Sequence, residues 1–229
     1  MDTNMDEIRN IGKMLLYTDL HFDETFGFII HHPFFQNSVY AVNTNDGLRV
    51  LNLTDREELS IARNEVKNLI DRTMTVADFL MLVTKPYLPA FFKFASGYMS
   101  EKDYSMFLAE MWITVEFPNY DKNISALQFV KLFKKANKKF LMTEEDLKYY
   151  DDLPETITVY RGVGHGANVH ALSWTTDIEK AKWFSQRWSE DGAVYSAEID
   201  KKDILAYFST RGESEVVVDF KKLKNIQKM

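Results

Sequence analysis

The sequence predicts an α+β protein whose first part is mainly helical and whose second part consists mostly of strands. Up to Pro154, capping residues recur together with apolar residues spaced three or four apart, which is typical of amphipathic helices. After Pro154, short runs such as 156–160 alternate between polar and apolar residues, which is typical of strands with one buried face. The glycines of this second part are not spaced as in a Rossmann fingerprint, so a dinucleotide-binding fold of that kind is not expected.

The length and composition fit a globular protein of one or two domains. The chain has 229 residues, of which 45% are hydrophobic and 14% are aromatic, and it can therefore build a substantial core. We place a boundary near residue 120, which divides a mainly helical region with a small hairpin, 1–120, from a second domain, 121–229. No flexible linker marks this boundary.

Several classes of protein are disfavoured by the residue types. The net charge of −6 disfavours a dedicated nucleic-acid binder. The chain has no cysteine, and its five histidines lack zinc-type spacing with carboxylates, so we expect neither disulfides nor a metal site. We find no signal peptide and no apolar run of membrane-spanning length, and we expect a cytoplasmic location without a membrane partner. No Gly-x-Ser-x-Gly elbow or P-loop supports a serine hydrolase or a P-loop nucleotide hydrolase.

A β-hairpin is predicted in the first region, because strand-like runs at 38–42 and 48–51 flank the turn sequence Asn45-Asp46-Gly47. Thr54, with Glu57 three residues later, forms a capping box that predicts the start of the next helix. The segment 75–115 is rich in large apolar residues, and its aromatic residues surround a helix instead of lining one face. This arrangement predicts a buried helix, with a partner-binding groove as the alternative. The residues are Phe91, Phe92, Phe94 and Tyr98.

Two further caps predict helices before Pro154. Ser125 with Gln128 forms a capping box, and Thr143 precedes a short helix. Five lysines lie largely outside the apolar face of the first of these helices, which favours a solvated face over a phosphate-binding patch. These are Lys131, Lys134, Lys135, Lys138 and Lys139.

Four strands are predicted after Pro154, at 156–160, 171–175, 194–199 and 215–220. Thr176, with Glu179 three residues later, predicts the N-cap of a helix between the second and third of these strands.

Arg161 directly follows the first predicted strand. It continues the period of two set by Ile157 and Val159, so a fixed cation is expected at the point where the strand ends. Gly162 comes next, with Gly164 and Gly166 close behind, and glycines allow the backbone to approach a ligand closely. An ion pair at the sheet edge is the structural alternative for this arginine.

Two pairs of polar residues accompany the later strands. Ser173 and Thr175 share one face of their strand, where hydroxyls can hold ribose oxygens or orient a carboxylate; ordinary strand decoration is the alternative. Glu213 and Glu215 stand at i and i+2 where the last strand begins, so we expect them side by side on one face. Like charges at that distance disfavour each other's ionised form, an arrangement that acid–base chemistry often uses.

The ordered set resembles the mono-ADP-ribosyltransferases of the Arg–Ser–Glu class. The resemblance covers roughly residues 125–220 and rests on three motifs in order. They are Val159-Tyr160-Arg161-Gly162, then Leu172-Ser173-Trp174-Thr175-Thr176 with Ala181 and Phe184 at the family's offsets, then Glu213-Ser214-Glu215. The family's usual Ser-Thr-Ser is Ser173-Trp174-Thr175 here, which keeps hydroxyls at both inward positions.

The resemblance implies two small, mainly antiparallel sheets around an NAD cleft, with NAD as co-substrate and no metal. Arg161 and Gly162 would hold the NAD phosphates or adjoining ribose, and Ser173, supported by Thr175, would position NAD and the catalytic carboxylate. Glu215 would accept a hydrogen bond from the 2′-hydroxyl of the nicotinamide ribose, and Glu213 would orient or deprotonate the acceptor. Phe184, or its neighbour Trp183, would line the nicotinamide pocket, and Tyr207 and Phe208 would lie in the turn that recognises the target.

The activity implied by the resemblance is transfer of ADP-ribose from NAD to a protein arginine. Two alternatives are transfer to a nucleic-acid base and hydrolysis of NAD. The lysine-bearing helix is the only observation that supports a nucleic-acid acceptor. A catalytically silent interaction module of the same fold is a third. A toxin, a phage effector delivered to another cell and a housekeeping regulator all remain open, as does an antitoxin or carrier partner.

Overall fold

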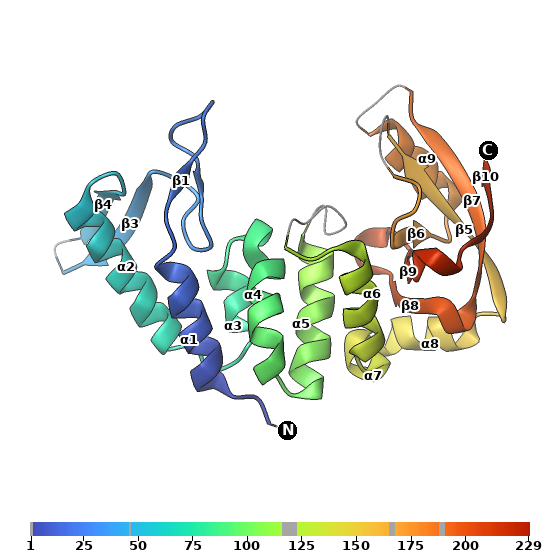
Figure 1. Cartoon of the computed structure of the whole chain (residues 1–229), viewed down its shortest axis with the longest axis horizontal. Helices are drawn as coiled ribbons and strands as arrows, with labels where there is room; N and C mark the ends of the chain where they lie inside the picture. The colour runs from blue at the N-terminus through green and yellow to red at the C-terminus, as the bar shows by residue number, and fades with distance from the viewer. Residues whose placement is uncertain (1, 46, 116–122, 165–167, 188–190) are drawn as a thin grey trace. The chain divides into compact units, whose positions relative to one another are not determined.

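The structure, a computed structural model, describes residues 2–45, 47–115, 123–164, 168–187 and 191–229, without the side chain of Arg211. The chain divides into two compact units, Met1–Glu116 and Phe117–Met229. Helices dominate the first unit and a six-stranded antiparallel sheet dominates the second (Figure 1), so the predicted α+β class is confirmed. Within the described parts of the chain, no helix has the length and apolar character needed to cross a membrane.

The N-terminal unit combines helices with small antiparallel hairpins. Its helices are α1 (Met5–Leu16), α2 (Arg56–Asp71), α3 (Asp78–Leu82), α4 (Leu88–Ala95) and α5 (Glu101–Thr114), with the 3-10 helices η1 (Lys85–Tyr87) and η2 (Ser96–Tyr98). Its hairpins pair β1 (His21–Phe22) with β2 (Ile30–His31), and β3 (Val39–Thr44) with β4 (Gly47–Asn52).

The predicted hairpin is confirmed, because β3 pairs with β4 from Val39↔Asn52 to Thr44↔Gly47. Gly47 has a φ of 117°, which a residue with a side chain rarely adopts. Asp46 of the predicted turn lies outside the described residues.

The helix that follows begins one residue later than the capping box predicts. Asp55, and not Thr54, is the N-cap of α2, and its carboxylate accepts from the backbone N–H groups of Glu57 and Glu58 at 2.9 and 3.0 Å. The Thr54 hydroxyl donates instead to Asn52 Oδ1. A carboxylate next to the helix start satisfies two free N–H groups and complements the positive end of the helix dipole.

The aromatic segment supplies the core of the N-terminal unit. Phe91 and Phe92 are fully buried, and the ring of Phe91 stacks on that of Phe79 with centroids 4.6 Å apart. The expectation of burial all round the helix is wrong for Phe94 and Tyr98, which are 49% and 40% exposed. One side of α4 therefore packs in the core, and Phe94 lies on the exposed side of the same helix.

The C-terminal unit begins with helices and continues into the sheet. The helices are α6 (Ala126–Lys135), α7 (Lys138–Leu141), α8 (Glu144–Asp152) and α9 (Ile178–Gln186), with the 3-10 helices η4 (Lys201–Asp203), η5 (Thr210–Gly212) and η6 (Phe220–Lys222). The strands are β5 (Thr156–Val163), β6 (Ser173–Thr175), β7 (Ala193–Asp200), β8 (Ile204–Phe208), β9 (Glu215–Val218) and β10 (Lys224–Lys228). They form one sheet in the order β10-β7-β5-β6-β9-β8, with every pair antiparallel.

The sheet consists of two three-stranded halves that meet at a single pair of residues. β5 pairs with β7 over eight residues, from Thr156↔Asp200 to Val163↔Ala193. In contrast, β5 pairs with β6 only at Tyr160↔Thr175. We expected two small sheets, whereas the described strands of this unit form one sheet. Its two halves are nevertheless joined only at the pair Tyr160↔Thr175.

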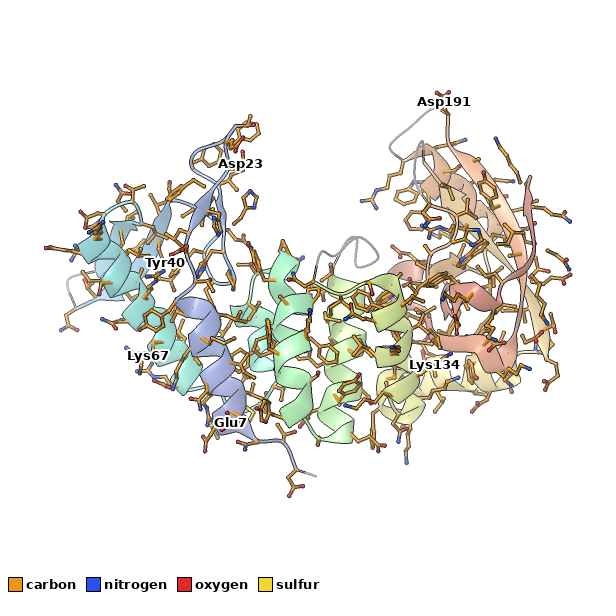
Figure 2. The ribbon with its side chains drawn as sticks, in the orientation of Figure 1. Glu7, Asp23, Tyr40, Lys67, Lys134 and Asp191 are labelled. Atoms are coloured by element: carbon orange, nitrogen blue, oxygen red, sulfur yellow. The ribbon has the colours of Figure 1, made fainter. Side chains whose placement is uncertain are left out.

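The capping box of Ser125 and Gln128 is confirmed at the start of α6, and Thr143 caps α8. The lysine-bearing segment is not one continuous helix, because Ala136 is extended and Asn137 caps α7. Lys134, labelled in Figure 2, pairs with buried Asp219 at 2.6 Å.

Lys138 of the same segment also binds within the unit. Its Nζ donates to the carbonyl of Ile204 at 2.9 Å and lies 3.8 Å from the centroid of the Tyr150 ring. Burial lowers the pKa of Lys138 to about 8. Lys134 and Lys138 therefore join helices to the rest of their unit, and do not belong to a purely solvated face.

Helix α9 lies unusually close to the sheet because two glycines face it. A Cβ added at Gly162 would lie 2.0 Å from the carbonyl oxygen of Ala181, and one added at Gly192 would lie 1.7 Å from that of Ser185. The N-cap of α9 is Asp177, which accepts from the backbone N–H groups of Glu179 and Lys180. The predicted cap at Thr176 is thus wrong by one residue, as at α2.

Candidate functional site

The three motifs of the C-terminal unit lie on three neighbouring strands. Arg161 is on β5, Ser173 and Thr175 are on β6, and Glu215 begins β9. Tyr160 pairs with Thr175, and Thr175 pairs with Glu215, so these residues form one rung across the strands. Residues that are 15 and 40 positions apart in the sequence are thereby paired at the middle of the sheet.

Arg161 contacts β6 through its guanidinium group. Its Nη1 donates to the main-chain carbonyl of Ser173 at 2.5 Å. The strands are not paired at this level, since their single rung is one residue earlier, at Tyr160↔Thr175. The arginine therefore binds a backbone oxygen that the ladder leaves available, and its half-buried side chain lies where the two halves of the sheet separate.

Alternation along the strands places Arg161 and Glu215 on opposite faces at their Cα atoms. Glu215 shares its rung, and hence its face, with Thr175 and Tyr160, and Arg161 is the residue after Tyr160. A ligand that touches both side chains would therefore lie in the region where β5 and β6 are not paired, and not over one face of a flat sheet.

Thr175 holds the segment that carries the two glutamates. Its Oγ1 donates to the carbonyl of Glu213 at 2.8 Å and accepts from the backbone N–H of Asp177 at 3.0 Å. The next residue, Thr176, donates its N–H to the carbonyl of Ser214 at 3.2 Å. Thr175 is buried, and its hydroxyl thus connects the start of α9 to the backbone before β9. The role of this hydroxyl in supporting Ser173 stays a prediction.

The expectation that Glu213 and Glu215 lie side by side on a strand is wrong. Strand β9 begins at Glu215, Ser214 has a φ of 46°, and Glu213 has helical backbone angles after η5. The chain reverses here between antiparallel β8 and β9, and the alternation of a strand does not extend into such a reversal. Both side chains are half-buried, but their orientation relative to each other is determined by the turn and not by strand alternation.

Gly162 and Phe184 lie at the contact between β5 and α9. The close approach at Gly162 is made by α9 itself, since a Cβ there would also lie 2.9 Å from Cβ of Phe184. The glycine therefore has a packing reason that the sequence did not reveal, and its contact with a ligand stays a prediction. Phe184 is half-buried, and its ring meets that of Trp183 edge to face at 4.9 Å.

Tyr207 and Phe208 do not lie in the turn before the glutamates. They belong to β8, where they are 5% and 3% exposed, and they pair with Val216 and Glu215. The run Ile204–Phe208 is apolar throughout and buried at every position, although β8 is the last strand of the sheet, because helices α6 and α8 pack against it. Burial raises the pKa of Tyr207. Direct recognition of a target by these two side chains is not compatible with this burial.

Two residues that had no predicted role lie against the motifs. Tyr149 of α8 stacks on Tyr207 with ring centroids 4.1 Å apart, and its hydroxyl donates to Thr176 Oγ1 at 3.5 Å. Ser214 supplies the left-handed backbone between the glutamates. Only the second could have been suspected, because a short polar residue between two like-charged ones is suited to a turn.

In the described parts of the chain, no group of three or more histidine, aspartate or glutamate side chains is placed to hold a metal ion. Comparisons with protein-family models, with curated proteins and with solved structures found no match for the chain. A functional assignment therefore depends on the chemistry of the chain's own residues.

Proposed function

We propose that the C-terminal unit is a mono-ADP-ribosyltransferase that cleaves NAD and transfers ADP-ribose to a protein arginine. One observation carries the proposal: β5, β6 and β9 are neighbours and bring Arg161, Ser173 and Glu215 to the middle of the sheet. The weak joining of the two half-sheets, at one rung, gives secondary support to the proposal.

The proposed reaction breaks the bond between nicotinamide N1 and ribose C1′, and its electron pair leaves on neutral nicotinamide. Positive charge then develops on the sugar, as in glycoside hydrolysis. A fixed carboxylate at Glu215 would stabilise this charge more in the transition state than in the ground state. Arg161 would bind the NAD phosphates, because a guanidinium fork matches phosphate oxygens.

The acceptor step needs a second group. A guanidinium nitrogen of the target would attack C1′, and Glu213 would align it and take its proton. Thr175 would act as a positioning residue, because its hydroxyl binds the backbone of Glu213. The half-buried Phe184 would offer its ring to the nicotinamide.

Transfer to a nucleic-acid base is less well supported than transfer to protein. The observation that supported a nucleic-acid acceptor was the lysine-bearing segment. In the structure, however, Lys134 is paired with Asp219 and Lys138 is bound to the Ile204 carbonyl. An interaction module without catalysis remains the non-enzymatic alternative.

The test is release of nicotinamide from NAD by the purified chain. We expect Glu215→Gln to slow release by about 10²–10³-fold. We expect Glu213→Gln to retain slow hydrolysis and to lose transfer. Glu198→Gln is the matched control, because Glu198 is an exposed glutamate of the same sheet and should keep the full rate.

Two results would contradict the proposal. The first is nicotinamide release by Glu215→Gln at the rate of the unchanged chain. The second is no release by the unchanged chain even with a cell lysate as the source of acceptor. Labelled NAD followed by protease or nuclease digestion of the lysate would then identify the class of acceptor.

A further inference from the structure

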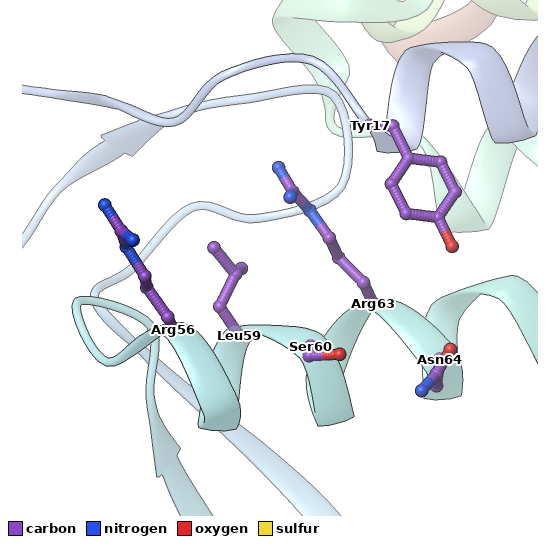
Figure 3. A pocket seen from close by; sticks show the side chains of 6 residues that line it. All are labelled: Tyr17, Arg56, Leu59, Ser60, Arg63 and Asn64. Carbon is purple, nitrogen blue, oxygen red and sulfur yellow. The ribbon is translucent and has the colours of Figure 1, made fainter.

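The N-terminal unit contains a pocket that is independent of the proposed NAD site. Its volume is about 370 Å³, and it is lined by Tyr17, Arg56, Leu59, Ser60, Arg63 and Asn64 (Figure 3). Five of these residues repeat every three or four positions along one face of α2. Tyr17 directly follows α1. Its ring closes the side of the pocket that lies opposite α2, as Figure 3 shows.

Two arginines supply the charge of this pocket. The Arg63 guanidinium is fixed, since its Nη2 donates to the carbonyl of Thr18 at 2.8 Å and the group lies 5.6 Å from the centroid of the Tyr17 ring. Arg56 is exposed, and within the described residues it makes no hydrogen bond or ion pair. Both side chains extend from α2 to the same side (Figure 3).

Among the residues that the structure describes, none that lines the pocket carries a carboxylate. Two of the three acidic residues near the start of α2 have other partners: Asp55 caps the helix, and Glu58 pairs with Arg49 at 2.9 Å. The third, Glu57, is not among the residues that line the pocket. Further along the helix, Lys67 is paired with Asp71 at 2.6 Å. In a chain of net charge −6, this face of α2 therefore keeps a local positive charge.

The donors and dimensions of the pocket indicate the chemistry of a ligand. Guanidinium groups bind phosphate oxygens in pairs, and the hydroxyl of Ser60 and the amide of Asn64 add neutral donors beside them. Arg56 and Arg63 are two helical turns apart, which corresponds to about 10 Å along the axis. Leu59 lies between them as an apolar surface. The volume falls within the range of about 300–1,000 Å³ that is typical of small-molecule sites.

We propose that this pocket binds a small phosphate-bearing anion with at least two negative charges. Arg63 provides the fixed cation, Arg56 closes on the ligand from the exposed side, and Ser60 and Asn64 donate to its oxygens. The ligand is either a free polyphosphate or the phosphate end of a nucleotide, which share this chemistry.

The test is calorimetric titration of the full chain with inorganic pyrophosphate and with ADP at about 0.15 M salt. We expect Arg56→Gln to weaken binding at this site by about tenfold or more. Arg72→Gln is the matched control, because Arg72 is an exposed arginine at the end of the same helix and outside the pocket. It should change the affinity by less than about twofold.

The two probes separate the two sources of phosphate. Equal affinity for pyrophosphate and ADP would assign a free polyphosphate, and tighter binding of ADP would assign a nucleotide that also contacts Leu59. Since ADP also resembles part of NAD, the readout is the difference between the unchanged chain and Arg56→Gln. The proposal is overturned if neither probe binds below about 10 mM, or if Arg56→Gln and Arg72→Gln weaken binding equally.

Discussion

Each of the two units of the chain is stabilised internally by a different kind of interaction. In the N-terminal unit, large rings fill the core, with Phe91 packed between Phe79 and Phe107 at centroid distances of 4.6 and 5.6 Å. In the C-terminal unit, a continuous antiparallel ladder joins β5 to β7, and two glycines let α9 lie against it. The first unit is therefore most sensitive to loss of side-chain volume. The second is most sensitive to atoms added where two backbones meet.

Truncation of a core ring should give the largest effect and should be confined to the N-terminal unit. Phe91→Ala removes a fully buried ring and should lower the free energy of unfolding of that unit by about 3–5 kcal/mol. Phe94→Ala, on the same helix but 49% exposed, should cost less than about 1 kcal/mol. Urea unfolding followed by hydrogen exchange in each unit would measure both, and similar losses for the two variants would contradict the assigned core.

Acidification should also act on the N-terminal unit, through His32. This side chain is 1% exposed, and its Nδ1 accepts from the backbone N–H of Phe34 at 3.1 Å. Burial, with a contribution from the charge of Arg63, lowers the pKa of His32 from 6.5 to about 4. The unfolded chain takes up this proton first, so stability is complete above pH 6.5 and falls as the pH drops toward 4.

The expected loss is about 3 kcal/mol by pH 4. It would be measured as the difference in pH dependence between the unchanged chain and His32→Gln, which does not titrate. Parallel stability curves for the two proteins between pH 7 and 4 would show that His32 is not held neutral.

A smaller effect is expected from a methyl group added between β5 and α9. Gly162→Ala forces a displacement, because its Cβ would lie 2.0 Å from the Ala181 carbonyl, and should cost about 1–3 kcal/mol in the C-terminal unit. Gly164→Ala is the control, since nothing lies within 4 Å of its Cβ. If the two variants unfolded at the same urea concentration, the close packing of α9 would be refuted.

The four helix starts that the capping residues predicted are correct to within one residue, and the two errors have a common cause. At both Thr54-Asp55 and Thr176-Asp177, two residues able to cap a helix are adjacent, and the aspartate takes the cap. Each aspartate accepts from two backbone N–H groups. At Ser125 no aspartate competes, and the predicted box forms.

The missed strands show what periodicity does not reveal. Ile204–Phe208 is buried at every position, so it has no polar–apolar alternation. Lys224–Lys228 lies at the edge of the sheet and is mostly exposed, so its strand character comes only from pairing with β7. The order of the motif residues along the chain was visible in the sequence. The geometry at Glu213 was not, because it depends on the reversal between β8 and β9.

The single rung between β5 and β6 has a mechanical consequence. Elsewhere in the ladder, moving two strands apart disrupts several backbone hydrogen bonds at once, whereas β5 and β6 are paired through their backbones only at Tyr160 and Thr175. The Arg161 guanidinium adds a side-chain link between the same two strands, through the Ser173 carbonyl. Within the described strands, the ladder is therefore weakest between the two halves, and unfolding of one half need not disrupt the pairing inside the other.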